Sequence, residues 1–318
     1  MSLSWLEAAV VGAMQGVAEL FPVSSLGHSV LIPAVVGGQW ARDLDVSSPE
    51  SPYLAFVVGL HVATALALIV YFRRDWYRII RGLVTSIVHR EIRDADQRLG
   101  WLLVLGTIPV GISGLLLEHT FRTVLSKPSV TAIFLMVNGL ILLGAEQLRK
   151  RSSVQVSAAG RGGEQPARIR EEPAEGERYV DERISGAASD ARLAKLPTGR
   201  AVLIAAAQIL ALAPGISRSG VTMVAGLLGG LSHQDAARFS FLLATPVILA
   251  AGVLKLGDLA GPLGDGIRGQ ILLGSLLSAI GAYLSVRFLT RYFATRSLRP
   301  FGVYCVVAGA FCLVWLSA

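Results

Sequence analysis

The sequence Gln15-Gly-Val-Ala-Glu-Leu-Phe-Pro-Val-Ser-Ser-Leu-Gly-His28, here called motif 1, sets a carboxylate, two hydroxyls and an imidazole inside an apolar segment. A second sequence, Pro214-Gly-Ile-Ser-Arg-Ser-Gly-Val-Thr222, here called motif 2, sets one arginine among hydroxyls and glycines inside another apolar segment. Apolar packing does not require such groups. Motif 1 offers an acid and a base and motif 2 offers positive charge, so together they predict one polar site.

Prolines within both motifs indicate that each motif breaks a helix. Pro22 ends an apolar helix that begins at Trp5, and a second short apolar arm follows over 29–36. Neither arm comfortably supplies the ~20 residues that a membrane-spanning helix needs. Pro214 interrupts the apolar region 201–231 in the same way. We therefore expect two re-entrant helical hairpins, because non-helical backbone at membrane depth is tolerated only where it lines a cavity or is buried in protein.

The composition is that of a polytopic membrane protein. Of 318 residues, 53% are hydrophobic and only 16% are charged, whereas about 25% are charged in an ordinary soluble domain. Few segments have the period of a strand, so the spanning elements are expected to be helices. The net charge of +7 could suggest nucleic acid, but the basic residues lie in loops, where they indicate contact with an anionic membrane surface and no nucleic-acid partner.

Six further segments predict full membrane spans, at 53–72, 99–117, 130–148, 239–256, 269–288 and 300–316. Each half of the chain then contains one hairpin followed by three spans. The predicted fold class is an all-α polytopic membrane protein with six transmembrane helices and two re-entrant hairpins arranged as inverted repeats. The repeats cover 1–148 and 201–318, and the charged, Gly/Ser/Pro-containing segment 149–200 is expected to be a flexible cytoplasmic loop.

Basic residues in the connections predict the orientation. Seven lie in 73–98, eleven in 149–200 and three in 290–300, against one in 39–53, two in 119–129 and one in 257–268. Loops rich in Lys and Arg remain in the cytoplasm. With three spans per half, hairpin one then enters from outside and hairpin two from the cytoplasm, and inverted repeats of this kind place a polar site near the midplane.

Motif 1 contains candidates for acid–base and nucleophilic chemistry. Gln15 and Glu19 are four residues apart and share a helix face; the alternative is a polar pair that packs helices. Ser25 and His28 are three apart around a turn, so the imidazole could activate either hydroxyl, Ser24 or Ser25. Alternatively, the imidazole caps the turn by bonding a backbone carbonyl.

Motif 2 has the composition of a phosphate site. Arg218 is the one arginine within an apolar turn, and hydroxyls surround it at Ser217, Ser219 and Thr222. A guanidinium fork, hydroxyls and the N-terminus of the following helix are the groups that bind phosphate. The alternative is an internal ion pair between Arg218 and Glu19, and both can hold in the empty protein.

Other polar residues are weaker candidates. His61 and Thr64 could face the cavity, but a single histidine on an apolar face is more often a hydrogen-bonded packing residue. Four charged residues near segment ends are explained by snorkelling: Glu118, Glu146, Lys255 and Arg287. His233 is expected in a loop.

These motifs resemble the bacterial undecaprenyl-pyrophosphate phosphatase family, integral-membrane enzymes also linked to bacitracin resistance. The resemblance rests on Gln15-x-x-x-Glu19, on Pro22-Val-Ser-Ser-x-Gly-His28, on all of motif 2 and on Phe239-Ser-Phe-Leu-Leu-Ala-Thr-Pro246. It covers nearly the whole chain. Gln15 stands where many members have Glu, Leu26 replaces a commoner Thr, and the loop 149–200 is longer than usual.

The resemblance implies a function in the bacterial inner membrane. The substrate would be a C55 polyprenyl pyrophosphate, and its hydrolysis to the monophosphate carrier would serve peptidoglycan synthesis, with the site facing outward and a divalent cation, Mg²⁺ or Ca²⁺, as cofactor. Glu19 with Gln15 would hold metal or water, Ser25 would be nucleophile or phosphate ligand, and His28 would be acid or base. Arg218 and its neighbouring hydroxyls, with Ser24, would bind the pyrophosphate. Whether two copies form a homodimer stays open.

A transporter or lipid flippase is the rival reading, because inverted repeats with broken helices are also transporter architecture. A passive membrane scaffold would leave Glu19, His28 and Arg218 unexplained. A transporter needs charge and donors but no activated hydroxyl, so the Ser25/His28 pair favours an enzyme.

Overall fold

A computed structural model describes residues 3–44, 52–125, 127–159, 186–254 and 266–317, and every regular element assigned in these ranges is helical. The first half contains α1 (Trp5–Ala18), α2 (Ser25–Val36), α3 (Gly38–Asp43), α4 (Pro52–Tyr71), α5 (Arg73–His89), α6 (Ala95–Val124) and α7 (Pro128–Ala159). The second half contains α9 (Thr198–Ala206), the 3-10 helix η1 (Ala207–Leu212), α10 (Arg218–Leu228), α11 (His233–Leu254), α13 (Arg268–Thr295) and α14 (Arg299–Ser317).

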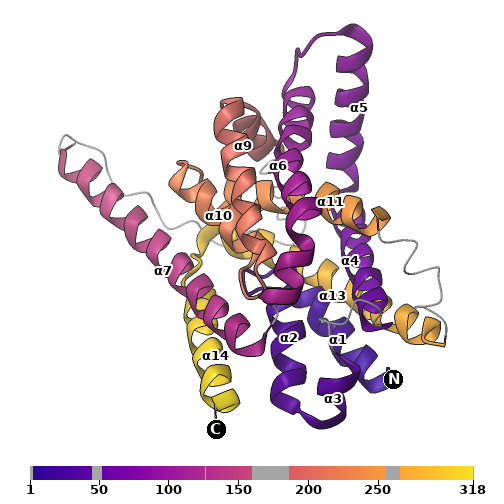
Figure 1. The fold of residues 1–318 in the computed structure, drawn as a ribbon. Coiled ribbons are helices and arrows are strands. Elements are labelled where there is room, and N and C mark those ends of the chain that lie inside the picture. The colour runs from indigo at the N-terminus through magenta and orange to yellow at the C-terminus, as the bar shows by residue number, and fades with distance from the viewer. Residues whose placement is uncertain (1–2, 45–51, 126, 160–185, 255–265, 318) are drawn as a thin grey trace, which may run out of the picture.

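The helices are those of a polytopic membrane protein (Figure 1). Within the described ranges five helices are long and apolar enough to cross a membrane, or up to seven if each of two sharply bent pairs is one span. Large apolar side chains point outward along the candidate spans, as Leu276, Val307 and Phe311 do. Polar side chains such as Gln15, Glu19 and Asn138 are buried instead. This distribution is expected of a protein whose solvent is lipid.

The two hairpin arms of motif 1 form as short helices. Ser4 caps α1 in a capping box with Glu7, and the chain leaves the helix at Glu19 before Pro22. Helix α1 packs tightly along α13, because a Cβ at Gly16 would lie 2.2 Å from the backbone oxygen of Ser278. Small residues permit this close approach between membrane helices, and they fix the arm that carries Gln15 and Glu19.

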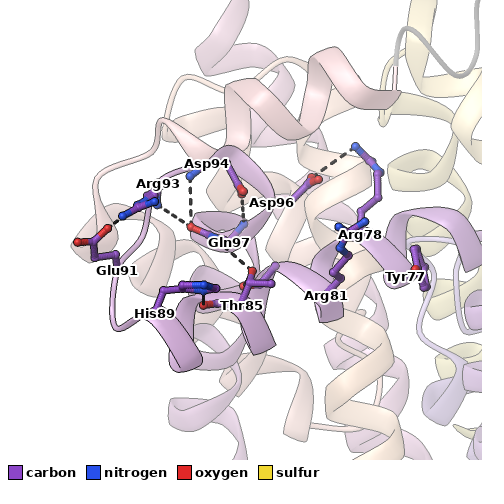
Figure 2. Close-up of a pocket in the computed structure, with 11 residues that line it drawn as sticks. Tyr77, Arg78, Arg81, Thr85, His89, Glu91, Arg93, Asp94, Asp96 and Gln97 are labelled. Carbon is purple, nitrogen blue, oxygen red and sulfur yellow. Dashed lines mark hydrogen bonds and ion pairs between the residues drawn. The ribbon is translucent and has the colours of Figure 1, made fainter.

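The segment 73–98, which the sequence predicts as a basic connection, contains a helix. Helix α5 follows α4 after a bend of 87° and packs on α6. A polar pocket of about 430 Å³ lies between α5 and the start of α6 (Figure 2). Arg78 pairs with Asp96 across 3.4 Å, and Arg93 pairs with Glu91. The three arginines that line this pocket are matched by three acidic residues.

The prediction of a flexible loop over 149–200 is wrong at both of the ends that the structure describes. Residues 149–159 continue α7, and Gly186–Ala194 forms a helix. Asp190 of that helix is buried and accepts hydrogen bonds from Arg238 Nε at 2.6 Å and Arg78 Nη2 at 2.9 Å. These charged pairs fix the short helix to α5 and α11, and the rest of the segment, 160–185, lies outside the described residues.

Two other expectations need correction. Glu146 does not snorkel: it is buried, and its carboxylate accepts from the backbone N–H of Leu298 at 2.8 Å and lies 2.5 Å from His233 Nε2. His233 is the first residue of α11 and not part of a loop. Together these contacts join α7 to the start of α11 and to the residue that precedes α14. Arg287 is exposed, as expected near a segment end, whereas the side chains of Glu118 and Lys255 lie outside the described residues.

Candidate active site

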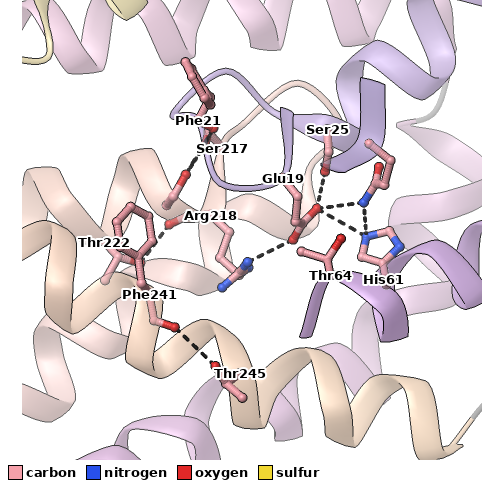
Figure 3. Close-up of polar contacts among 12 residues, drawn as sticks. Glu19, Phe21, Ser25, His61, Thr64, Ser217, Arg218, Thr222, Phe241 and Thr245 are labelled. Carbon is pink, nitrogen blue, oxygen red and sulfur yellow. Dashed lines mark hydrogen bonds and ion pairs between the residues drawn. The ribbon is translucent and has the colours of Figure 1, made fainter. Parts of the chain in front are cut away.

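The site forms where the two broken helices meet. Glu19 is the C-terminal cap of α1, and Ser24 and Ser25 begin α2 after the turn. Ser217 caps the N-terminus of α10, so Arg218 is the first residue of that helix. Figure 3 shows the Glu19 and Arg218 side chains pointing toward each other from the two motifs. Residues about 200 positions apart in the sequence therefore share one buried site.

Glu19 is the centre of this cluster. Its Oε1 accepts a hydrogen bond from Arg218 Nη2 at 2.9 Å. Its Oε2 accepts from the Ser25 hydroxyl and from Gln15 Nε2, the latter at 3.0 Å. His61 Nε2 lies 3.4 Å from the same oxygen. The Glu19 side chain is only 7% exposed and the Arg218 side chain 14%. The ion pair that was the alternative interpretation of Arg218 is therefore present and largely removed from solvent.

Two polar atoms of the cluster are buried without a partner. One is Arg218 Nη1, a cationic donor, and the other is Gln15 Oε1, an acceptor. An unsatisfied buried polar group costs about 1–3 kcal/mol, and more when it is charged. Such groups therefore call for an explanation in a native structure. A free guanidinium donor beside a hydroxyl is suited to an anionic ligand, and a free amide oxygen beside a carboxylate is suited to a cation.

The hydroxyls of motif 2 hold the two motifs together. Ser217 and Ser219 both donate to the backbone oxygen of Phe21, at 3.4 and 3.2 Å. Ser217 also accepts from the N–H of Gly220, and Thr222 donates to the carbonyl of Arg218 at 2.8 Å. All three hydroxyls have backbone partners, so in this state they shape the site around Arg218.

Ser24 has an unusual backbone conformation at the start of α2. Its φ is 67°, in the left-handed region that residues other than glycine rarely adopt. Its hydroxyl accepts from the N–H of Gly27 at 3.2 Å. Strained positions of this kind cluster at functional sites, and here the conformation lets the chain turn so that Ser25 faces Glu19.

His28 is not in contact with Ser25 in the described structure. Its Nδ1 lies 2.7 Å from the carbonyl oxygen of Ser24, and its Nε2 lies 2.7 Å from the hydroxyl of Tyr304. The imidazole therefore makes the turn-capping contact that was the alternative reading of the sequence. The group next to the Ser25 hydroxyl is Glu19.

Two residues contribute more to the site than the sequence indicated. His61 was a weak candidate, but it lies 3.2 Å from Gln15 Nε2 as well as beside Glu19, and its Nδ1 is held by the carbonyl of Val57. Asn138 was missed. Its amide group donates to the carbonyl of Pro22 at 3.1 Å and accepts from the N–H of Ser217 at 3.0 Å.

Asn138 therefore bridges the turns of both motifs. The only signal in the sequence is one amide side chain within an apolar span, which reads equally well as a packing residue. Thr64 makes packing contacts, to Ser278 at 3.0 Å and to the carbonyl of Leu60 at 3.1 Å.

Comparison with known proteins identifies the family. The model of the family described as bacitracin resistance protein BacA matches residues 8–311. The chain belongs to the BacA family. A BacA-related protein of Mycolicibacterium paratuberculosis, named undecaprenyl-diphosphatase, is 60% identical over 99% of this chain and 98% of its own length. Undecaprenyl-diphosphatase 1 of Frankia casuarinae is 52% identical, over 98% of each chain. Undecaprenyl-diphosphatase 2 of Burkholderia orbicola is 42% identical, over 96% of this chain and 94% of its own.

Two oxygen-bearing side chains of the cluster in this BacA family chain are of the ligand type that a divalent cation takes. Within the described residues no three His, Cys, Asp or Glu side chains are grouped to hold a metal. The site does offer the Glu19 carboxylate and the unpartnered Gln15 Oε1. Mg²⁺ is commonly held by one or two carboxylates together with substrate phosphates and water, so one carboxylate and one amide oxygen match that donor set.

Proposed function

We propose that this chain is an integral-membrane phosphatase that hydrolyses undecaprenyl pyrophosphate to undecaprenyl phosphate and inorganic phosphate. This activity recycles the lipid carrier of peptidoglycan synthesis and accounts for bacitracin resistance. The relatives named undecaprenyl-diphosphatase support it at up to 60% identity over nearly the whole chain. The structural observation that carries it is the buried guanidinium of Arg218, which has one free donor beside the Ser25–Glu19 pair.

We propose the following arrangement in the bacterial inner membrane. Helices α4, α6, α7, α11, α13 and α14 are the six spans, and the first and second repeats, 1–148 and 201–318, each contribute one re-entrant hairpin. The arms α1 and α2, of 14 and 12 residues, are too short to span. Figure 1 shows the α1–α2 hairpin and the α9–η1–α10 hairpin approaching each other from opposite ends of the molecule. The basic connections place the α5 end in the cytoplasm, and the site opens outward.

The geometry favours Ser25 as the nucleophile. A serine is activated when an adjacent base accepts its proton, and Ser25 already donates to Glu19. In the proposed first step Ser25 Oγ attacks the terminal phosphorus, its proton passes to Glu19, and the bond from that phosphorus to the bridging oxygen breaks. The products are phosphoserine and undecaprenyl phosphate. Arg218 Nη1 binds the oxygens of the transferred group, whose charge it stabilises.

Glu19 then loses that proton to solvent. In the second step a water molecule attacks the phosphorus of the phosphoserine and gives a proton to Glu19, and the bond from phosphorus to the Ser25 oxygen breaks. The Ser25 oxygen takes that proton from Glu19 as inorganic phosphate leaves. We propose His28 as the acid that protonates the bridging oxygen in the first step, because it lies one turn from Ser25 on α2. His61 and Gln15 hold the Glu19 carboxylate in place through the contacts described above.

The remaining motif hydroxyls complete the substrate site. These hydroxyls belong to residues close in sequence to Ser25 or Arg218: Ser24, Ser217, Ser219 and Thr222. We propose that those bonded to Phe21 in the free protein, Ser217 and Ser219, turn toward phosphate oxygens in the complex. Glu19 and Gln15 Oε1 would hold a divalent cation, Mg²⁺ or Ca²⁺, which when bound supplies positive charge for the pyrophosphate oxygens.

A phosphoenzyme trap tests the role of Ser25. Purified protein is mixed with undecaprenyl pyrophosphate labelled in the terminal phosphate, quenched in acid within milliseconds to seconds, and analysed by peptide mapping. Label at Ser25 is expected in the wild type and in Ser29→Ala, a matched buried serine one turn along α2, but not in Ser25→Ala. Rapid turnover without any label on the protein would show that water attacks directly.

A further inference from the structure

A second basic site lies on the surface of α13 and shares no residue with the Glu19 cluster. The C-terminal part of α13 and the connection to α14 line a groove of about 430 Å³, within the range of about 300–1,000 Å³ found for ligand pockets. Its lining consists of Leu284, Arg287, Phe288, Arg291, Tyr292, Thr295 and Arg296. Three of these seven residues are arginines, and Arg287 and Arg291 lie four apart on one helix face.

The charged residues that line this groove are all basic. No acidic residue lines it, and among the described residues neither Arg287 nor Arg296 has an ion pair or a side-chain hydrogen bond. The pocket beside α5 differs, because three acidic residues line it together with its three arginines, and Arg78 pairs with Asp96 there (Figure 2). Arginine in a groove whose lining holds no carboxylate is suited to phosphate, which its planar fork binds with two hydrogen bonds.

The wall of the groove is apolar and preformed. Phe288 stacks on Phe21 of motif 1, with ring centroids 5.9 Å apart, and lies 5.5 Å from Tyr292. Tyr292 in turn meets Phe301 of α14 edge-on at 5.4 Å. The outward side of this wall is open, since Phe288 is 51% exposed and Leu284 is 58% exposed. An acyl chain can lie along these two side chains.

The depth of the arginines matches a lipid headgroup. Helix α13 has 28 residues and is therefore about 42 Å long at 1.5 Å per residue, which exceeds the hydrocarbon thickness of about 30 Å. Arg287 and Arg291 lie within the last three turns of α13, and Arg296 follows its last residue. Long basic side chains at such positions reach the headgroup region. Basic pockets between spans on the cytoplasmic side are typical binding places for anionic headgroups.

We propose that this groove is a specific binding site for an anionic glycerophospholipid. The phosphate would contact Arg287, Arg291 and Arg296, and an acyl chain would follow Leu284 and Phe288. In the orientation proposed above, the lipid belongs to the cytoplasmic leaflet. Charge complementarity selects this occupant over a zwitterionic lipid, and the exposed apolar wall selects a lipid-borne phosphate over a soluble one.

Native mass spectrometry of the purified protein in detergent tests this site. The protein is titrated separately with phosphatidylglycerol, phosphatidylcholine and inorganic phosphate, and adducts are counted as a function of concentration. Phosphatidylglycerol is expected to bind the wild type at much lower concentration than phosphatidylcholine, and inorganic phosphate is not expected to compete. Equal retention of the two lipids, or competition by inorganic phosphate at matched concentration, would overturn the proposal.

Substitutions locate the bound lipid. Each arginine near an anionic surface contributes about a fivefold change in affinity, so Arg287→Gln should weaken phosphatidylglycerol binding about fivefold and the triple Gln variant about 100-fold. Arg268→Gln, at the opposite end of the same helix and also exposed, is the matched control and should bind as the wild type does. Unchanged affinity in a triple variant that melts at the wild-type temperature would show that the lipid binds elsewhere.

Discussion

Replacing Arg218 by lysine separates the two uses of its guanidinium. In the free protein Nη2 pairs with Glu19 at 2.9 Å, and Nη1 is buried without a partner. A lysine retains one positive charge for Glu19 but lacks the planar fork with its second donor. The variant should therefore fold and keep the ion pair, and it should lose one contact to the transferred phosphate.

The expected loss follows from that single contact. A hydrogen bond that involves a charged group contributes about 1.5–3 kcal/mol, and 1.36 kcal/mol corresponds to a tenfold change in rate. The kcat/KM for phosphate release should fall about 10- to 160-fold in Arg218→Lys. Arg218→Gln should do more damage, because an uncompensated buried carboxylate at Glu19 costs about 3–5 kcal/mol of stability.

The assay is release of inorganic phosphate from undecaprenyl pyrophosphate in detergent, with thermal melting of the same samples. Arg81→Lys, at an exposed arginine of α5 (Figure 2), is the control and should have wild-type kcat/KM. If folded Arg218→Lys retained kcat/KM within twofold of the wild type, the free Nη1 would have no part in binding the phosphate, and the reasoning would be refuted.

Three further predictions concern stability and the cation. Asn138→Ala should lower the melting temperature in detergent, because it leaves buried groups of both motif turns unpaired at about 1–3 kcal/mol each; an unchanged melting curve would contradict the bridging role. Gly16→Ala should destabilise the protein, since its Cβ would lie 2.2 Å from Ser278 O, whereas the same change at Gly111 meets nothing within 4 Å and should be tolerated; equal melting temperatures for the two variants would argue against the tight α1–α13 contact. Chelation with EDTA should abolish phosphate release without changing the melting temperature, because Glu19 stays paired in the metal-free protein, and Mg²⁺ should restore it; full activity in excess EDTA would exclude the cation from the mechanism.

The sequence predicted the parts of the site that follow from helix-breaking residues and from the free-energy cost of burying an unpaired charge. Pro22 and Pro214 break apolar segments, and the structure has turns at both places. The cost of unpaired charge at membrane depth required a partner for Glu19, and the Glu19–Arg218 ion pair confirms that inference. Ionisable groups in apolar surroundings have few possible partners, so their pairing can be inferred across a long sequence separation.

The contributions of His61 and Asn138 could not be predicted in this way. A single histidine or amide in a span can form its hydrogen bonds in a purely structural role, so its presence does not indicate a site. The partners of His61 and Asn138 lie in other parts of the chain. The pairing of Ser25 with Glu19 instead of His28 depends on the φ of 67° at Ser24, which the residue type does not favour.

The errors in the connections have a related cause. Arg78, Asp190 and Arg238 read as loop or surface charges in the sequence, because each is expensive to bury alone. In the structure Asp190 is buried and pairs with both Arg78 and Arg238, and three helices that are distant in the sequence meet around these residues. Local composition does not reveal a network of this kind. The sequence therefore predicts only a basic connection where α5 forms, and a flexible loop where the helix Gly186–Ala194 forms.

The central claim is that the Glu19–Ser25–Arg218 cluster hydrolyses a lipid pyrophosphate. Its most direct test is phosphate release from undecaprenyl pyrophosphate by purified wild-type protein with Mg²⁺, beside Glu19→Gln and Ser25→Ala. The account predicts release by the wild type and a loss of at least about 10²-fold in each variant, as expected for removal of a base or a nucleophile. Well-folded wild-type protein that binds the lipid pyrophosphate but releases no phosphate would contradict it and would favour a lipid-phosphate transporter.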